Sequence, residues 1–292
     1  MNRVIAVAGG KGGTGKTFIA VNVAYLLSER GTVLLIDADV ENPTTTIFMK
    51  TPPKRVIEIR SFKPVIVEER CTKCGLCIKC CPEHALVLLP SGNILFVEEM
   101  CSGCGICKLV CRSNAVVDGK RLDGFYKYYE PNTKLSLIAG ELKPGNRRHN
   151  TLIAKLIEDH KDLFERYDFV VIDSPPGTAA GVYSTLEYAD TIIAVVEPTP
   201  LGANDLRKFL TLVKMFGDKK LVVVLNKYGI PGGCYEEISN IVTASKATLF
   251  TIPYNKLIIE TYIHGDIFVK RHPRSSITSK FRKLVSSLDY TT

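Results

Sequence analysis

The chain has 292 residues, of which 46% are hydrophobic, 38 are basic and 30 are acidic, so its formal net charge is +8. This length allows one large α/β domain or two smaller domains around a substantial apolar core, which excludes a disordered chain. No apolar run reaches the roughly 18 residues of a membrane-spanning helix, and none has the pattern of a signal sequence, so we expect a cytoplasmic protein.

The first elements are predicted to be a strand, a loop and a helix. Residues 4–8 are continuously apolar and end at two glycines, and residues 18–28 carry apolar side chains at helical spacing. A second buried strand is expected at 32–36, ending in Asp37-Ala38-Asp39. After residue 44 this alternation stops, and a stretch marked by lysine and proline, 52–64, leads into a block of cysteines. An insertion is therefore expected there.

Strands and helices alternate again in the second half of the chain. The expected strands are 169–172, 191–196, 221–225 and 248–252, and the expected helices are 152–164, 182–188, 204–216 and two stretches near the C-terminus. The strands are continuously apolar, as in a sheet covered on both faces. The predicted fold class is therefore α/β with a mostly parallel sheet.

A phosphate-binding loop follows the first strand. Residues 10–17, Gly-Lys-Gly-Gly-Thr-Gly-Lys-Thr, match the pattern G-x-x-x-x-G-K-T between a predicted strand and a predicted helix. Glycines let backbone N–H groups converge on phosphate oxygens at the N-terminus of a helix. Lys16 is expected to reach the β- and γ-phosphates and the Thr17 hydroxyl to hold Mg²⁺. The predicted ATP-binding residues are Gly10, Lys11, Gly12, Gly13, Thr14, Gly15, Lys16 and Thr17.

The loop carries a second lysine, Lys11, directly after its first glycine. In this feature the sequence resembles the superfamily of MinD, ParA and the nitrogenase iron protein. In that superfamily the extra lysine crosses a dimer interface to the nucleotide of the other subunit. The resemblance implies a MinD-like P-loop ATPase that forms a nucleotide-dependent homodimer, with Lys11 among its catalytic residues. A solvated surface lysine is the alternative.

Two strand ends extend the resemblance. It makes residues 37–43 switch I, with Asp39 orienting or deprotonating the attacking water and Asp37 close to the Mg²⁺ ligands. It makes residues 173–177 switch II, with Asp173 holding Mg²⁺ through a water molecule and Gly177 sensing the γ-phosphate. The catalytic set is thus Lys11, Lys16, Asp39 and Asp173. An aspartate at a strand end can also serve only as a turn or helix cap.

The resemblance also suggests an adenine site. Asn226 follows the strand expected at 221–225, where members of the superfamily read adenine with an asparagine amide. Pro253 matches the second adenine-side segment, although Asn255 stands where aspartate is more common. An asparagine after a strand is also an ordinary turn residue.

Nine of the ten cysteines lie between Cys71 and Cys111. They include two runs of the form Cys-x-x-Cys-x-x-Cys-x-x-x-Cys, the spacing of a bacterial ferredoxin with two 4Fe–4S clusters, in which the fourth cysteine of each run binds the other cluster. The first predicted set is Cys71, Cys74, Cys77 and Cys111, and the second is Cys101, Cys104, Cys107 and Cys81. Zinc is the competing interpretation, but zinc ribbons carry two ligand pairs separated by a longer loop.

Some cysteines and surfaces are interpreted as structural. Cys80 is a spare thiol beside Cys81, and a single Cys234 cannot complete a four-thiolate site across a dimer. The apolar face of residues 277–288 is expected to dock on the core, with a membrane-binding tail as the alternative. The basic segment 270–274 is expected to be a solvated loop, with DNA binding as the alternative.

The two motifs predict a discontinuous protein. Residues 1–58 and 132–292 are assigned to the ATPase domain, and residues 59–131 to an inserted ferredoxin-like α+β domain. We expect a slow, partner-stimulated ATPase whose dimer change is coupled to electron transfer or metallocluster maturation for an unidentified redox or metalloprotein partner. The alternative is a positioning or partition ATPase with structural clusters, although nothing in the sequence favours a nucleic acid or a membrane strongly.

Overall fold

The computed structural model describes residues 3–288 and divides the chain into two compact units. The larger unit consists of Met1–Val56, Tyr126–Glu141 and His149–Thr292. The second, here called the cysteine unit, consists of Ile57–Phe125 and Leu142–Arg148. The first of its segments overlaps the insertion expected at 59–131. The other, Leu142–Arg148, lies outside that insertion and contains no cysteine.

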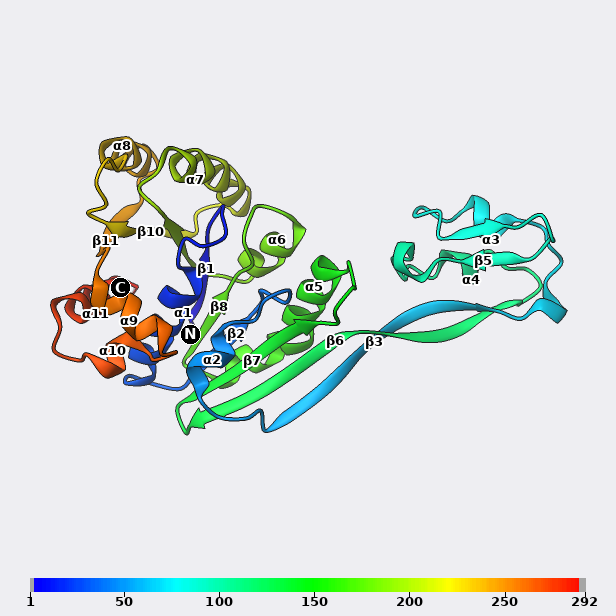
Figure 1. The fold of residues 1–292 in the computed structure, drawn as a ribbon, viewed down its shortest axis with the longest axis horizontal. Coiled ribbons are helices and arrows are strands. Elements are labelled where there is room, and N and C mark those ends of the chain that lie inside the picture. The colour runs from blue at the N-terminus through cyan, green and yellow to red at the C-terminus, as the bar shows by residue number, and fades with distance from the viewer. Residues whose placement is uncertain (1–2, 289–292) are drawn as a thin grey trace. The chain divides into compact units, whose positions relative to one another are not determined.

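A largely parallel sheet forms the centre of the larger unit (Figure 1). Its strand order is β11-β10-β9-β1-β8-β2-β7-β6-β3, and neighbouring strands from β11 to β7 pair in parallel. The strands are β1 (Arg3–Ala8), β2 (Val33–Asp37), β3 (Arg55–Ile66), β6 (Val116–Asn132), β7 (Leu135–Leu142), β8 (Phe169–Asp173), β9 (Thr191–Val196), β10 (Lys220–Tyr228) and β11 (Thr248–Pro253). The predicted α/β class is confirmed.

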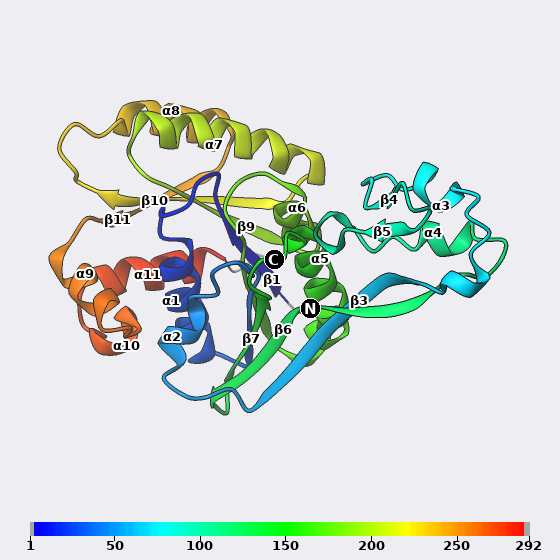
Figure 2. The same cartoon turned by 45° about the vertical axis from the view of Figure 1, so that its right-hand side comes forward.

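Helices cover both faces of this sheet. On one face, Ile5 and Val7 of β1 pack in an apolar core with α1 (Lys16–Ser28), α10 (Phe268–Arg271) and α11 (Ser276–Ser287). The alternate residues of β1 are also buried, and α7 and α8 lie over the opposite side from α1 and α11 (Figure 2). Burial of both faces explains why these strands are continuously apolar. The remaining helices of this unit are α2 (Thr45–Met49), α5 (His149–His160), α6 (Ala180–Glu187), α7 (Pro200–Val213), α8 (Tyr235–Ala244) and α9 (Lys256–Ile263).

Several elements differ from the sequence-based expectations. The stretch expected only to lead into the insertion is strand β3, in which only two of the twelve residues are buried, so it lacks a buried-strand pattern. The strand β7 and the helix α8 were not predicted. The helix expected at 152–164 ends as an α-helix at His160 and continues as a 3₁₀ turn over Lys161–Arg166. Up to residue 288, three helices follow β11 where two were expected.

The cysteine unit is an internal repeat. Short 3₁₀ turns at Glu68–Arg70 and Glu98–Met100 precede the helices α3 (Leu76–Lys79) and α4 (Ile106–Leu109), and β4 (Leu86–Leu88) pairs antiparallel with β5 (Ile94–Phe96). Each half begins against the end of the other half. The N–H of Val67 in the first half donates to the carbonyl of Ala115 in the second, and the N–H of Val97 in the second donates to the carbonyl of Ala85 in the first, each at 2.8 Å. The apolar core of the unit consists of Cys77, Leu86, Cys107 and Val116.

Candidate functional site

The predicted phosphate loop lies between the end of β1 and the start of α1. Gly15, its last residue before the helix, has a φ of 98°, a left-handed conformation that favours glycine. A Cβ at this position would come within 2.3 Å of the side-chain nitrogen of Asn226, so no larger residue fits. Because no side chain caps α1, the N–H groups of its first turn are open to an anionic ligand.

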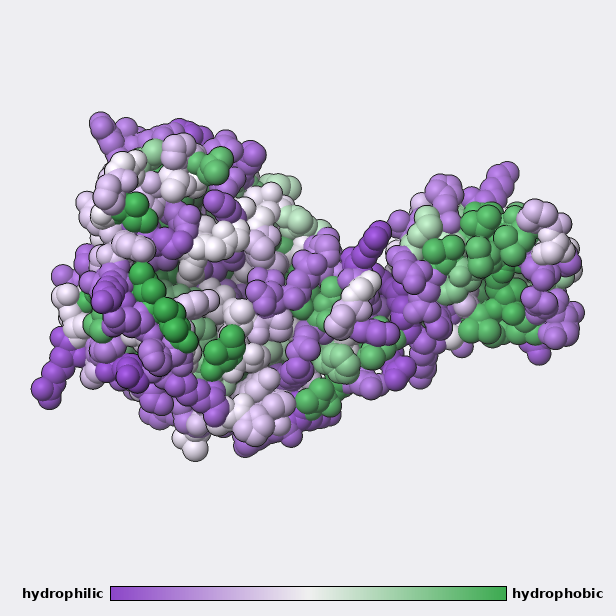
Figure 3. Space-filling view, viewed as in Figure 1, coloured by the Kyte–Doolittle hydropathy of each residue, from purple (hydrophilic) through white to green (hydrophobic). Residues whose placement is uncertain are grey.

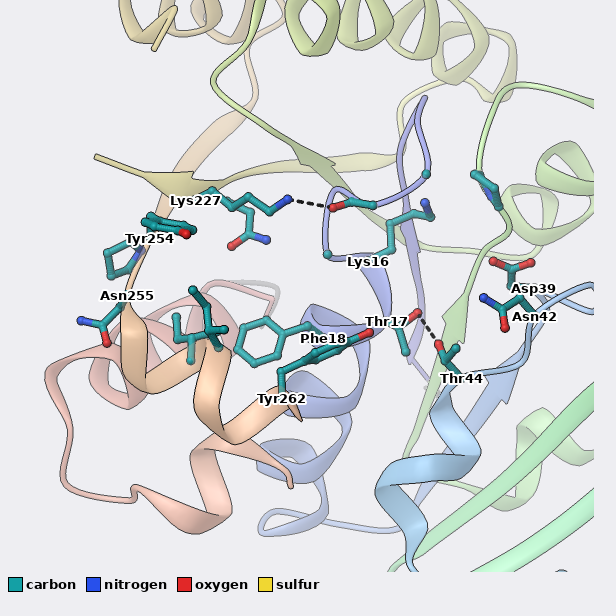
Figure 4. Close-up of a pocket in the computed structure, with 18 residues that line it drawn as sticks. Lys16, Thr17, Phe18, Asp39, Asn42, Thr44, Lys227, Tyr254, Asn255 and Tyr262 are labelled. Carbon is teal, nitrogen blue, oxygen red and sulfur yellow. Dashed lines mark hydrogen bonds between the residues drawn. The ribbon is translucent and has the colours of Figure 1, made fainter. Parts of the chain in front are cut away.

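A cavity of about 410 Å³ adjoins the loop (Figure 4). Its volume is that of a small-molecule site, which typically encloses about 300 to 1,000 Å³. The predicted nucleotide residues that line it are Gly12, Gly13, Gly15, Lys16, Thr17, Asp39, Asn226 and Pro253. Gly10, Lys11 and Thr14 line a neighbouring hollow of about 10 Å³ instead. Most of the predicted site therefore surrounds one cavity.

Lys16 is buried at the polar end of this cavity. Its Nζ donates to the carbonyl oxygen of Lys11 at 2.9 Å, so the loop itself holds the ammonium group. Burial lowers the pKa of Lys16, whereas the charges of Asp173 and Asp39 raise it. A buried cation beside carboxylates and backbone N–H groups is suited to binding a phosphate chain.

Asp37 and Asp173 end the neighbouring strands β2 and β8 and lie opposite each other in register. Both oxygens of Asp37 are occupied: Oδ2 accepts from the N–H and the hydroxyl of Thr45 at 3.0 and 2.6 Å, and Oδ1 accepts from the N–H of Asp39 at 3.1 Å. Burial raises the pKa of Asp37 to about 7. Asp37 thus anchors the start of α2 inside the protein.

Asp173 differs in that neither carboxylate oxygen has a hydrogen-bond partner within the described residues, although the side chain is buried. Burial and the neighbouring Asp37 carboxylate raise its pKa well above the usual range. The Thr17 hydroxyl lies nearby and accepts from Thr44 at 3.4 Å. An unpartnered buried carboxylate beside a hydroxyl is a donor set that fits a hard cation such as Mg²⁺.

Asp39 lines the cavity on the same side as Lys16, Thr17 and Thr44 (Figure 4). Burial raises the pKa of Asp39, and the Lys16 charge lowers it. Gly177 does not line the cavity, but its N–H donates to the carbonyl of Gly9 at 3.3 Å and so links the predicted switch II to the loop. Lys11 is exposed.

The opposite side of the cavity is more apolar. Tyr254, Ile258 and Tyr262 line it, and Asn226 also lines the cavity. The side-chain nitrogen of Asn226 donates to the carbonyl of Thr14 at 2.8 Å, and Asn255 caps α9 by accepting from the N–H of Leu257 at 2.8 Å. Sequence reasoning missed the two tyrosines, because no short motif marks them. Aromatic and aliphatic groups opposite a phosphate loop suit a nucleobase.

The first predicted cysteine set lies together. Cys71, Cys74, Cys77 and Cys111 line one small hollow, although Cys111 comes from the second run. In the second set, burial, with smaller contributions from charge on Cys101 and Cys104, raises the pKa of Cys107 to about 11. Cys81 and Cys111 occupy equivalent places in the repeat, where their sulfurs accept the N–H of Ala85 and Ala115 at 3.3 and 3.2 Å.

Cysteine thiols are ligands for soft metals such as iron. Thiols whose pKa is raised by burial ionise readily only next to a cation, as iron supplies. Over residues 3–288, no group of three or more cysteine, histidine or acidic side chains is arranged around a single ion. Cys80 is exposed, and the backbone N–H of Cys234 bonds to the carbonyl of Pro198 at 3.1 Å beside the start of α8.

The C-terminal helix and the basic segment agree with their structural interpretation. Ile277, Phe281, Leu284 and Val285 of α11 are buried in the core, so this face is not available to a membrane. In the basic segment, Arg271 pairs with Asp266 at 2.7 Å. No helix among the described residues is long and apolar enough to span a membrane.

The chain is similar in sequence to known nucleotide-binding proteins. Residues 5–268 match the CobQ/CobB/MinD/ParA nucleotide binding domain family (CbiA). The chain is 30% identical to the protein MJ0579 of Methanocaldococcus jannaschii over 91% of both chains. It is 22% identical to the cytosolic Fe-S cluster assembly factor NUBP2 of Gallus gallus, over 94% of this chain and 88% of that protein.

A shorter segment of the chain is similar to a protein of another kind. Over 35 residues, 12% of this chain and 33% of the other, it is 51% identical to the ketoisovalerate oxidoreductase subunit VorD of Pyrococcus furiosus. Among solved structures, the cell division ATPase MinD of Pyrococcus furiosus superposes with a TM-score of 0.62 at 20% identity, covering 99% of this chain and 98% of that one. The MinD of Pyrococcus horikoshii with Mg-ADP superposes equally well, with a TM-score of 0.62 at 21% identity over 99% and 96% of the two chains.

Proposed function

This chain belongs to the CobQ/CobB/MinD/ParA family of nucleotide-binding domains, and we propose that its ATPase cycle is coupled to two 4Fe–4S clusters held by the cysteine unit. In this proposal, ATP binding and hydrolysis change a homodimer, and that change controls electron transfer or iron–sulfur maturation for a partner protein. The partner is a redox protein or a metalloprotein.

One connection along the chain carries the proposal. Asp37 ends β2 beside the nucleotide cavity and holds Thr45, the first residue of α2, through two hydrogen bonds. Only five residues separate the end of α2 at Met49 from Arg55, the start of β3. Strand β3 then contributes residues to both units. A shift of switch I on nucleotide binding therefore has a short covalent path to the first cysteines.

The residues of the larger unit divide the work of phosphoryl transfer. Lys16 exchanges its bond to the Lys11 carbonyl for the β- and γ-phosphates, and the uncapped first turn of α1 binds the remaining phosphate oxygens. Asp39 orients the attacking water and accepts its proton. Mg²⁺, when bound by Thr17 and through water by Asp173, supplies charge neutralisation. Lys11, which is exposed, reaches the nucleotide of the second subunit.

The cysteine unit contributes the redox function. Each cluster, when bound, supplies a one-electron couple. Cys71, Cys74, Cys77 and Cys111 hold the first, and Cys101, Cys104, Cys107 and Cys81 the second. The similarity to NUBP2, named as an Fe-S cluster assembly factor, and the short match to an oxidoreductase subunit both support a role in iron–sulfur chemistry.

The test uses the full chain, purified without oxygen. We expect about eight irons and eight sulfides per chain, and ATP hydrolysis at a measurable rate. The reduction potentials of the clusters should differ between the Mg-ADP complex and the complex with a non-hydrolysable ATP analogue. Lys16→Ala should abolish that difference, and Lys161→Ala, which removes an exposed lysine paired with Glu158, should not. Equal potentials and equal electron-transfer rates with both nucleotides would refute the coupling.

A further inference from the structure

The cysteine unit contains a buried cluster of three charges. The side chains of Arg121 and Asp123 are each 7% exposed, and that of Arg148 is 12% exposed. Both arginines bond to Asp123 Oδ1 at 3.2 Å, Arg121 through Nε and Arg148 through Nη1. Two guanidinium groups share one carboxylate, so the cluster keeps one net positive charge. Buried charges normally occur in compensated pairs, and this excess cation needs a negative neighbour.

Arg121 lies against the second cysteine run. Its Nη1 donates to the carbonyl of Glu98 at 2.5 Å and its Nη2 to the carbonyl of Cys101 at 3.2 Å. These two bonds fix the backbone that leads into the run. The second bond joins the guanidinium group to the backbone of Cys101, a predicted ligand of the second cluster.

Arg148 approaches the same cysteine from the other segment of the unit. A Cβ on Gly103 would stand 2.6 Å from Arg148 Nη2, and the N–H of Gly103 donates to Cys101 Sγ at 3.3 Å. Arg148 Nε is buried and has no hydrogen-bond partner within residues 3–288. Burial lowers the pKa of Arg148, whereas negative charge on Asp123 and on Cys101 raises it.

The first cysteine run has no such arrangement. Position 73 of the first run corresponds to Gly103, and there the chain has Lys73 with the same left-handed backbone, φ 60° against 76°. The φ alone therefore does not require glycine, and what Gly103 provides is room for Arg148. The hollow at Cys71, Cys74, Cys77 and Cys111 is lined by no charged side chain.

We propose that Arg121 and Arg148 act as positioning residues that give the second cluster site, that of Cys101, the higher reduction potential of the two. This inference rests on the proposed function, since it assumes that both clusters are present. A one-electron donor loses its electron to the pair of clusters, the electron resides at the second site, and no bond is formed or broken. The second site is then the one from which an acceptor takes the electron.

Opposing effects exist but are weaker. The Ser113 hydroxyl lies 3.6 Å from the sulfur of Cys111 in the first set, and a neutral hydrogen bond of that length stabilises added charge only slightly. Glu98, close to the second run, is already paired with Lys63 at 2.7 Å and is partly exposed. A buried net cation acts through a lower dielectric than either of these groups, so its effect dominates.

The experiment is a redox titration of the anaerobically purified full chain, followed by electron paramagnetic resonance. Arg148→Met should lower the potential of one cluster, and Asp123→Asn, which adds one net positive charge, should raise the potential of that same cluster. Each shift should change the reduction equilibrium at least tenfold, about 59 mV for a one-electron couple. Cys104→Ser, which alters one ligand of the second set only, identifies which signal moves.

Lys108→Met is the matched control, because Lys108 is 48% exposed and lies beside Cys107 of the same set, so solvent should keep its shift below tenfold. Shifts of both clusters together, shifts of the same sign in the two variants, or movement of the first cluster alone would overturn the inference. If Arg148→Met fails to take up its second cluster, the direction of the Asp123→Asn shift decides alone. Absence of iron and sulfide from the wild-type chain would instead refute the proposed function.

Discussion

The larger unit buries its central strands almost completely, whereas the cysteine unit leaves many large apolar side chains exposed. In β1, the residues from Ile5 to Ala8 are at most 2% exposed. In the cysteine unit, Leu88 and Leu109 are 50% and 84% exposed, and Figure 3 shows apolar surface grouped over α3, α4 and β5. A small unit with so few buried side chains needs another source of stability. Burial therefore accounts for the stability of the larger unit, and in the proposed function the two clusters stabilise the smaller one.

Removal of the clusters is the strongest test of this comparison. Chelation of iron under reducing conditions should unfold the cysteine unit, because metal binding and folding are coupled when a core is small. Amide hydrogen exchange in residues 67–116 should accelerate by roughly 100-fold or more, and exchange in β1 and β8 should stay the same. The measurement is hydrogen exchange followed by mass spectrometry. A cysteine unit that keeps its protection without iron would contradict the comparison.

A substitution in the phosphate loop tests whether the cysteine unit depends on the larger unit. Lys16→Ala should reduce ATP turnover by about 100-fold or more, since it removes a charge that stabilises the transferring phosphoryl group. Iron and sulfide content should not change, because all eight proposed cluster ligands lie in the cysteine unit. Steady-state phosphate release and iron analysis on the same preparation measure both. Loss of iron in Lys16→Ala would show that the two units depend on each other for folding.

A change of pH perturbs the larger unit by a different route. Burial raises the pKa of Asp37 to about 7, above its value in an unfolded chain. Between the unfolded and the folded pKa the native state binds the extra proton, so the stability from this group is present at low pH and is lost as the pH rises through 7. The contribution of this group to the loss from pH 5 to pH 7 should be roughly 2 kcal/mol. Asp37→Asn should make the slope smaller, and the buried Asp173, whose pKa is also raised, accounts for the slope that is left.

The readout is hydrogen exchange of β8 in the nucleotide-free protein at several pH values. Exchange rates must be corrected for their intrinsic dependence on pH, and the Asp37→Asn protein provides that baseline. Equal slopes in the two proteins would show that the Asp37 carboxyl does not hold a proton near neutral pH in the folded state.

The sequence predicts the parts of this molecule that depend on local patterns. The loop of residues 10–17 lies between strand and helix as expected, and buried strands such as β9 have the expected bounds. The cysteine spacing places Cys111 with the first run, and the structure puts it in the same hollow as Cys71, Cys74 and Cys77. Each of these patterns is complete within a few tens of residues.

The features that the sequence did not predict depend on contacts between distant residues. Asp37 and Asp173 each end a buried strand, so the sequence does not distinguish them. In the structure Thr45 donates a hydrogen bond to the Asp37 carboxylate, whereas no described residue forms a hydrogen bond with that of Asp173. Tyr254, which directly follows β11, and Tyr262 of α9 line the cavity, and no motif marks their positions. Arg148 is 45 residues after Gly103, so only the fold reveals why that glycine is needed. Strand β3 was missed because only two of its twelve residues are buried, so it has no buried-strand pattern.

The smallest expected effect concerns how the larger unit supports its own loop. Asn226→Ala removes the bond from the Asn226 amide to the Thr14 carbonyl and should destabilise this unit by about 1 kcal/mol. Asn255→Ala is the matched control, because it removes the cap of α9 on the same cavity at a similar cost of about 1 kcal/mol. Only Asn226→Ala should also weaken Mg-ADP binding, by up to about tenfold, since the loop then needs the ligand to order it. Calorimetric titration of both variants measures this difference. If both variants bind Mg-ADP equally well, packing alone holds the loop in place, and the contrast with a cysteine unit that depends on its proposed clusters becomes sharper.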